Sequence, residues 1–287
     1  MAKTRLTFRT GPAISIGAPI AYMTLLFVAP IFVFLIYSFW RIEGFEIVQE
    51  WTLANYVYVL ENRVYIQLIV RSIGIGMITG IVTVVLSYPV AYAMVFRMKE
   101  GREAILLLML LSLFSSYLVR VYAWKTILGG NGVINSLLMS LGLVQEPLRW
   151  LIYSKFAVII TLTSVFLPIT VLPLYSSLMN IPYSLIEASR DLGAGSAQTF
   201  RKVTLPLSTP GMVAGFIFTF VLTAGDYVTP ALLGGSDGQM IGNSITSQFG
   251  VASNWPLGSA ITFFVVAALV VLFLFGGMLF KKLGLRG

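Results

Sequence analysis

The 287-residue sequence contains no cysteine and no histidine. Without cysteine, the chain forms neither disulfides nor thiolate metal sites. Without histidine, it lacks the commonest metal ligand and the usual general base of enzymes. A phosphate-binding G-x-x-x-x-G-K-[ST] loop is absent as well. We therefore expect a chain that is not itself catalytic, holds no metal or cofactor, and depends on another protein for ATP hydrolysis.

Charged residues are scarce too. They make up 10% of the chain, whereas 57% of the residues are hydrophobic. Soluble domains carry about 25% charged residues, so this composition predicts an integral membrane protein surrounded by lipid. The first apolar run is longer than a signal-peptide core, and we expect it to be retained as a membrane span.

Long uncharged stretches delimit the expected spans, because about 20 apolar residues cross the hydrocarbon core of a bilayer. The third helix is expected to continue through Arg120 and Lys125, and the fifth to continue to Leu233. The prediction is an all-α protein with six transmembrane helices in one domain over residues 1–287, at approximately 13–40, 68–96, 104–127, 156–180, 210–233 and 259–281.

Basic residues indicate how the chain is oriented. If six helices alternate, one side holds Lys3, Arg5, Arg9, Arg97, Lys99, Arg102, Arg190, Arg201, Lys202, Lys281, Lys282 and Arg286. The other side holds only Arg41, Arg63, Arg149 and Lys155. An excess of Lys and Arg marks the cytoplasmic side. Both termini and the connection at 181–209 are therefore predicted to be cytoplasmic, and the net charge of +8 requires no nucleic acid.

The connection at 181–209 is polar but shows the signals of ordered structure. Ser184 and Glu187 have the spacing of a capping box, which predicts a short helix that ends at Gly193. Ser196 is expected to cap a second short helix, which Pro206 ends. The connection should therefore be a rigid pair of helices joined by a glycine elbow.

Thr209-Pro210 then has the pattern of an N-cap followed by proline, which opens the next long helix. Two pairs of glycines with four-residue spacing, Gly76/Gly80 and Gly211/Gly215, are expected to be positions where helices pack closely. Residues 131–142 and 242–256 are amphipathic and predict short helices in the plane of the interface.

Glu187-Ala188-Ser189 is followed by Gly193 and then by Val203-x-Leu205-Pro206. This pattern resembles the coupling loop of ABC-importer permeases, E-A-A, three residues, G, nine residues, I-x-L-P. Ser189 and Val203 are mild departures from it. The resemblance implies that the loop is cytoplasmic and docks in a cleft of an ATPase subunit, through Glu187, Ala188, Ser189, Asp191, Gly193, Leu205 and Pro206. The alternative is an ordinary helix–turn–helix connection in which Glu187 only caps.

Two further stretches, 118–137 and 225–258, resemble the spermidine/putrescine branch of this permease family. The resemblance implies a type I ABC-importer fold in the bacterial inner membrane and a polyamine as the solute. It also implies three partners: a cytoplasmic ATPase dimer that binds ATP and Mg²⁺, a second permease that is a copy or a paralogue, and a periplasmic solute-binding protein. Related permeases carry iron, thiamine, amino acids or other small solutes, which stay as alternatives.

Polar side chains within spans indicate candidate positions along the solute pathway, because they are costly unless they face protein or water. On a continuous fifth helix, Thr219, Thr223 and Asp226 share one face, and on a continuous third helix Ser112, Ser116 and Arg120 do. The alternative is that such stripes only hold helices together. The candidate pathway residues are Asp226, Tyr227, Thr223, Thr219, Ser116, Arg120, Tyr117, Tyr122 and Trp124.

Asp226 is the only acidic residue within the expected spans, about 24 Å along the fifth helix from Pro210. Beside Tyr227, it suits a cationic solute through charge and cation–π attraction. Alternatively, it pairs with Arg71, Arg120 or Lys125. If those three cations face the pathway instead, a small anion is a competing solute. An ion-coupled transporter is a further alternative, which predicts paired acids or broken helices at the midplane.

Overall fold

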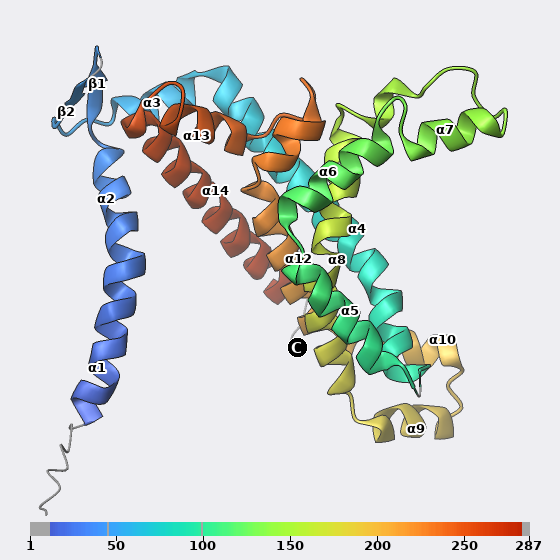
Figure 1. The fold of residues 1–287 in the computed structure, drawn as a ribbon. Helices are drawn as coiled ribbons and strands as arrows, with labels where there is room; N and C mark the ends of the chain where they lie inside the picture. Colours follow the sequence, from blue (N-terminus) through green and yellow to red (C-terminus); the bar gives the residue numbers. More distant parts are fainter. Residues whose placement is uncertain (1–11, 45, 99, 283–287) are drawn as a thin grey trace, which may run out of the picture. The chain divides into compact units, whose positions relative to one another are not determined.

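The computed structural model describes residues 12–44, 46–98 and 100–282, and this part is predominantly helical (Figure 1). Several basic residues used to orient the chain lie outside it: Lys3, Arg5, Arg9, Lys99 and Arg286. Internal contacts divide the chain into two units, residues 1–61 with 247–268 and residues 62–246 with 269–287. The assignment of residues 1–287 to one domain stays a prediction.

The first unit begins with a helical rod that contains one π-helical turn. α1 (Pro12–Met23), η1 (Thr24–Val28) and α2 (Ala29–Tyr37) follow one another without interruption. The segment Pro19–Tyr37 is long and apolar enough to span a membrane, and its side chains are largely exposed. Such a surface is expected of a helix that faces lipid.

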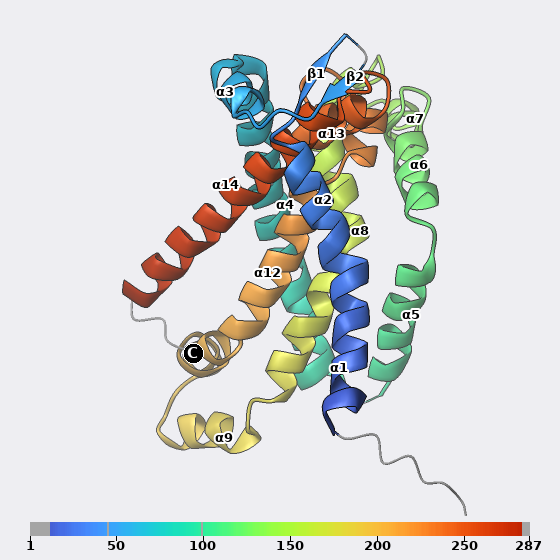
Figure 2. The ribbon, with the colours of Figure 1, turned by 90° about the vertical axis from the view of Figure 1, so that its left-hand side faces the viewer.

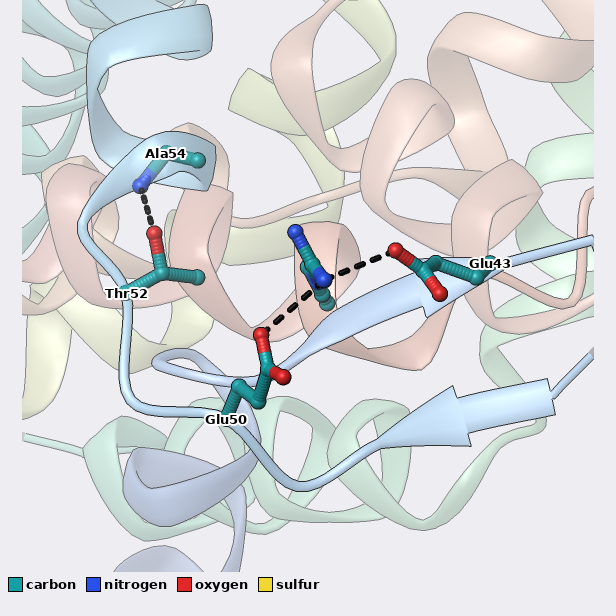
Figure 3. Close-up of polar contacts among 5 residues, drawn as sticks. Glu43, Glu50, Thr52 and Ala54 are labelled. Carbon is teal, nitrogen blue, oxygen red and sulfur yellow. Dashed lines mark hydrogen bonds and ion pairs between the residues drawn. The ribbon is translucent and has the colours of Figure 1, made fainter.

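A small β-hairpin follows the rod, which the prediction of an entirely helical chain did not include. β1 (Arg41–Glu43) pairs with β2 (Glu46–Val48) in antiparallel register, with Ile42 opposite Ile47. Arg41 Nη2 lies 2.8 Å from Glu43 Oε1 and 2.9 Å from Glu50 Oε2 (Figure 3). These exposed ion pairs add little stability. The hairpin was missed because three-residue strands are too short to show a hydrophobic period.

Aromatic side chains pack against one another in the first unit. Phe34 contacts Phe249 edge-on with ring centroids 5.6 Å apart, and it stacks on Trp255 at 6.3 Å. Tyr37 contacts Trp40 at 4.8 Å. Aromatic pairs at such distances add stability beyond the area that they bury. They hold the end of the rod against the start of α14 (Trp255–Lys282), beside α3 (Ala54–Glu61).

Three long helices form the core of the second unit: α4 (Arg63–Phe96), α8 (Lys155–Met179) and α12 (Thr209–Ala224) (Figures 1 and 2). α4 begins before the predicted residue 68 because Asn62 caps it: Asn62 Oδ1 accepts a hydrogen bond from Val64 N at 3.0 Å. Ser154 caps α8 in the same way through Ala157 N, at 3.1 Å. α14 likewise begins at Trp255 and not at residue 259.

Glycines allow these three helices to approach one another closely. A Cβ atom on Gly211 of α12 would lie 2.6 Å from Pro173 O, and one on Gly215 would lie 3.1 Å from Thr170 O, both on α8. On α4, a Cβ atom at Gly76 would lie 3.0 Å from the ring of Phe220. The close-packing prediction is confirmed. The order of these contacts also shows that α12 runs antiparallel to α8.

The prediction of a continuous third helix is wrong. α5 (Arg102–Phe114) and α6 (Tyr117–Leu128) are separate, because Ser115 and Ser116 are extended, with ψ of 141° and 128°. Arg102–Phe114 and Tyr117–Ser140 meet at a bend of 96°. The face predicted for Ser112, Ser116 and Arg120 requires an unbroken helix, so that prediction is wrong as well.

The fifth helix also ends before its predicted end at residue 233. α12 stops at Ala224, and a new helical segment starts at residue 228 and contains η4 (Pro230–Gly234). The break has a local cause. Asp226 Oδ1 and Oδ2 accept hydrogen bonds from Val228 N at 3.3 Å and Thr229 N at 3.1 Å. Asp226 therefore starts the next segment and is not on the face of α12 that carries Thr219 and Thr223.

Four unbroken segments in the described part are long and apolar enough to cross a membrane, and the number rises to six if each of two bent pairs is one span. The second bent pair, Ser196–Leu207 with Thr209–Ala224, bends by 59°. The two expected amphipathic helices are present as α7 (Val133–Ser140) and α13 (Ile241–Phe249). A single 3₁₀ turn, η2 (Arg149–Leu151), precedes α8.

Candidate functional site

The connection at 181–209 forms the ordered pair of short helices that the sequence predicts, and it lies at the opposite end of the second unit from α7 (Figures 1 and 2). Its first helix, α9 (Tyr183–Asp191), starts directly after Pro182. Ser184 is therefore inside the first turn and makes no cap hydrogen bond. The predicted capping box of Ser184 and Glu187 is wrong, because the N-cap of α9 is Pro182 and the helix has already begun at Tyr183.

Gly193 is the predicted left-handed elbow, with φ of +82°. Its N–H donates to Arg190 O at 2.8 Å, and the N–H of Ala194 donates to Ser189 O at 3.0 Å. These two bonds are the Schellman pattern, which satisfies the last carbonyls of a helix. The elbow is thus fixed by backbone hydrogen bonds and does not swing freely.

The second short helix does not end at Pro206 as predicted. It runs from Ser196 to Leu207 as α10 (Ser196–Thr199), η3 (Phe200–Thr204) and α11 (Leu205–Leu207). Proline is tolerated in the first turn of a helix, where its missing N–H is not needed. The π-helical turn ends just before Leu205, so Pro206 stands in the first turn of α11. Ser208, and not Thr209, is the N-cap of α12.

Side-chain contacts join the two short helices to the three-helix core. Ser189 Oγ and Thr199 Oγ1 are hydrogen-bonded at 2.8 Å, which links α9 to α10. The ring of Phe200 meets Tyr88 and Tyr92 of α4 edge-on, each with centroids 5.7 Å apart. We define these five residues as the coupling anchor. It makes the connection a rigid extension of α4.

The predicted coupling residues are mostly accessible. Glu187, Ala188, Asp191, Gly193 and Pro206 are exposed, whereas Ser189 and Leu205 are partly buried. Ile186 points the other way: it is 5% exposed and packs with residues of α4 and α8. The connection at 181–209 therefore has an inner face that packs on the core and an outer face that is exposed.

A second group of candidate residues lies at the end of α12 that is distal from this connection. We define Tyr117, Arg120, Asp226 and Thr229 as the distal cluster. Tyr117 Oη lies 2.7 Å from Thr229 Oγ1 and also interacts with the Asp226 carboxylate. Two helix breaks bring the cluster together. Tyr117 is the first residue of α6, and Asp226 caps the helical segment that follows α12.

The three cations considered as partners of Asp226 are engaged elsewhere. Arg71 Nη1 donates to Ser236 O at 3.0 Å, and Arg120 Nη1 donates to Val165 O at 3.1 Å. Lys125 Nζ lies 5.9 Å from the centroid of the Tyr122 ring. Within the described part, both ion pairs belong to Arg41. No ion pair in that part of the chain includes the Asp226 carboxylate.

The remaining candidate pathway residues are divided between the surface and the core. Tyr122 and Tyr227 are about half exposed, and Ser116 is exposed. Trp124 packs against the core cluster around Val121 and Leu128. Thr219 and Thr223 are both 0% exposed. In this conformation the threonine stripe lies between packed helices, as the alternative interpretation of these stripes requires.

Thr219→Val is expected to lower the free energy of unfolding by about 1 kcal/mol, the usual net contribution of one hydrogen bond. Thr219 Oγ1 and Thr170 Oγ1 are 2.6 Å apart in the buried α8–α12 contact. Thr223→Val is the matched control, because the buried Thr223 hydroxyl has no hydrogen-bond partner in the described part. Its loss should leave stability unchanged or higher. Thermal unfolding in detergent measures both, and equal effects would contradict the assignment.

Three features of these sites were not predicted from the sequence. The contacts of Phe200 with Tyr88 and Tyr92 join segments more than one hundred residues apart. The only signal for them in the sequence was the i, i+4 spacing of the two tyrosines, which places both rings on one face of a helix. Arg71 fixes the loop at 236–239 through Ser236 O and Gln239 O. Asn243 Nδ2 donates to Tyr227 O at 2.8 Å and so fixes the backbone beside Asp226. Only the fold brings these partners together.

In the second unit, apolar helices long enough to span a bilayer, an ordered helical connection at one end and broken helices at the other are the architecture of a multi-pass membrane protein. Residues 20–284 match the family model for the inner membrane component of binding-protein-dependent transport systems. The permease protein PotB of the spermidine/putrescine transport system of Haemophilus influenzae is 36% identical, over 74% of this chain and 73% of the relative. PotB of Escherichia coli K12 is 34% identical, over 77% of this chain and 80% of the relative.

The Escherichia coli K12 inner membrane ABC transporter permease protein YdcU is 33% identical, over 89% of this chain and 85% of that protein. Among solved structures, a bacterial ABC transporter for import of the polysaccharide alginate has the same fold, with a TM-score of 0.73, 16% identity and 94% of each chain covered. This chain belongs to the ABC-importer permeases, the inner membrane components of binding-protein-dependent transport systems. It is a multi-pass protein of the bacterial inner membrane with the type I permease fold.

Proposed function

We propose that this permease subunit carries a polyamine of the spermidine or putrescine type. The names of the PotB relatives support this substrate. The observation that carries the proposal is the distal cluster, where the Asp226 carboxylate has no ion-pair partner in the described part and Tyr117 and Tyr227 lie beside it. A polyamine is a flexible chain with several ammonium groups, which a carboxylate and aromatic faces attract.

The partners of the basic residues favour a cationic over an anionic solute. An anion in the pathway would have to compete for the N–H groups of Arg71 and Arg120 with the backbone carbonyl oxygens to which both donate. Their guanidinium groups serve to fix loops and helix contacts at this end. Broken helices alone also occur in ion-coupled transporters, but membership of the ABC-importer permeases does not favour that mechanism here.

We further propose that ATP is hydrolysed by a separate cytoplasmic ATPase dimer, which binds the exposed face of α9. Glu187, Ala188 and Asp191 form that face, and the coupling anchor joins its other side to α4. Closure of the ATPase on ATP would then move α4 as one piece with the connection, since a rigid contact transmits force that a flexible loop absorbs. ATP and Mg²⁺ belong to the ATPase in this scheme.

A second permease and a periplasmic binding protein complete the proposed complex. The PotC permease protein of Escherichia coli K12 is 30% identical over 37% of this chain, which supports a paralogous second subunit. A solved alginate transporter of the same fold is in complex with its periplasmic protein, at a TM-score of 0.72. We propose that an equivalent protein delivers the polyamine to the distal cluster.

Asp226→Asn is expected to reduce polyamine uptake by about ten-fold, the size of one charge-assisted hydrogen bond. Asparagine caps helices as well as aspartate does. Its one side-chain oxygen can keep one of the two hydrogen bonds from Val228 N and Thr229 N, so the turn should survive while the charge is lost. Uptake of labelled spermidine into proteoliposomes that contain the whole transporter measures the effect. Asp237→Asn, an exposed acid in the nearby loop, is the control and should leave uptake unchanged. Equal uptake by both variants would reject the cationic contact.

A further inference from the structure

A basic pocket lies where the end of α4 meets α9 and α10. Its volume is about 280 Å³, and its lining combines aromatic rings, hydroxyl groups and two guanidinium groups. Arg97 directly follows α4, and Arg190 is in the last turn of α9. Liquid water occupies about 30 Å³ per molecule, so the pocket has room for a phosphate with an attached glycerol.

The guanidinium groups of Arg97 and Arg190 are available to bind a ligand. Both are exposed, and neither forms an ion pair or a side-chain hydrogen bond that is resolved in the described residues. The acidic residues of α9, Glu187 and Asp191, do not line the pocket. Guanidinium groups bind phosphate through paired N–H donors. The chemistry of the lining therefore favours a phosphate group.

An apolar strip of α4 leads to this pocket. Ile81 is 52% and Val85 is 63% exposed, and Pro89 is exposed four residues further on. Continuing along the same face, Tyr92 and Phe96 line the pocket. α4 is one of the segments long and apolar enough to span a membrane. A ligand with a phosphate at one end and acyl chains at the other matches both surfaces.

We propose that this pocket binds the headgroup of an anionic phospholipid. Arg97 and Arg190 bind the phosphate, the rings of Tyr92, Phe96 and Phe200 contact the glycerol, and the acyl chains lie along the exposed strip of α4. Basic pockets between helices on the cytoplasmic side are known sites for anionic headgroups. The proposal does not depend on the solute that the transporter carries.

Binding there would have a mechanical consequence. Arg97 belongs to α4 and Arg190 to α9, and Phe200 is part of the coupling anchor. One headgroup that contacts all three would hold α9 against α4 and relieve the repulsion between two nearby guanidinium groups. The coupling connection would then be most rigid in a membrane rich in anionic lipid.

The test is binding of phosphatidylglycerol to the purified full chain, measured by native mass spectrometry from neutral detergent, with phosphatidylcholine as the uncharged comparison. The double change Arg97→Gln and Arg190→Gln should weaken phosphatidylglycerol binding about 25-fold, and either single change about five-fold, at about 1 kcal/mol per basic residue. Phosphatidylcholine binding should not change. Arg102→Gln is the matched control, because Arg102 is exposed at the start of α5 and does not line the pocket.

Each other outcome overturns the proposal. Equal weakening of phosphatidylglycerol binding by Arg102→Gln would show that the lipid is attracted to the general positive charge of this surface and not to the pocket. If inorganic phosphate displaces the lipid at equal concentration, the pocket is a free-anion site. If the double variant binds the lipid normally but no longer copurifies with an ATPase, the pocket is a protein contact. Thermal unfolding of each variant shows whether it is folded, and Arg97→Lys with Arg190→Lys should recover part of the binding because the charge remains.

Discussion

Gly211→Val is expected to lower the free energy of unfolding by about 3 kcal/mol or more and to reduce the yield of folded protein sharply. The new Cβ atom would lie 2.5 Å from Ser177 Cβ, 2.6 Å from Pro173 O and 3.1 Å from Leu174 Cα. Two of these atoms belong to the backbone of α8 and do not move aside on their own. The variant must therefore separate α12 from α8, which forfeits contacts along the whole interface.

Gly74→Val is the matched control for this experiment. Gly74 is also inside a long helix, α4, but a Cβ atom there has no neighbour within 4 Å. We expect a change of no more than about 0.5 kcal/mol for such a site. Thermal unfolding in the same detergent compares the two variants. If Gly211→Val, Gly74→Val and the unchanged chain have the same melting temperature, the contact between α8 and α12 is looser than the structure shows.

Gly193→Val is expected to abolish most coupled uptake while the three-helix core stays folded. The left-handed conformation costs an ordinary residue about 1–2 kcal/mol, and a β-branched side chain resists φ of +82° further. Nothing lies within 4 Å of the new Cβ atom, so the effect is conformational and not steric. Without the elbow, the bonds Gly193 N–Arg190 O and Ala194 N–Ser189 O are lost. We expect uptake to fall about ten-fold or more.

Gly195→Val separates this conformational effect from a general intolerance of the connection. Gly195 is two residues away and equally free of neighbours, but its φ of −69° suits any residue. It should retain normal uptake. ATP hydrolysis and solute uptake are measured together in proteoliposomes, because loss of coupling lowers uptake relative to hydrolysis. Normal coupled uptake by Gly193→Val would show that the elbow does not transmit the motion.

Local signals in the sequence predicted several features that the structure has. Gly193 was identified as a left-handed cap, and its backbone bonds have that pattern. Gly211 and Gly215 were identified as packing positions, and both face the backbone of α8. These features depend on a few neighbouring residues or on a helical period, so they are readable without the fold. The apolar stretches were readable for the same reason, because the bilayer fixes their length.

The prediction that the fifth helix continues to residue 233 was wrong because a local hydrogen bond competes with the helix. Asp226 ends α12 because its carboxylate holds Val228 N and Thr229 N, a competition typical of short polar side chains. Ser115 and Ser116 lie in the corresponding break between α5 and α6. A composition rich in apolar residues hides such breaks, since hydropathy measures the length of a span and not its continuity.

The sequence alone determined that this chain lies in a membrane, how its helices are ordered, and which connection has the coupling motif, because hydropathy, charge and local motifs are properties of short segments. Only the tertiary structure decided which polar residues meet. Thr219 is buried against Thr170, Phe200 contacts Tyr88 and Tyr92, and Asp226 lies beside Tyr117 with no ion-pair partner among the described residues. These pairings depend on helix crossings and breaks, which arise from the packing of segments distant in sequence and leave no local pattern.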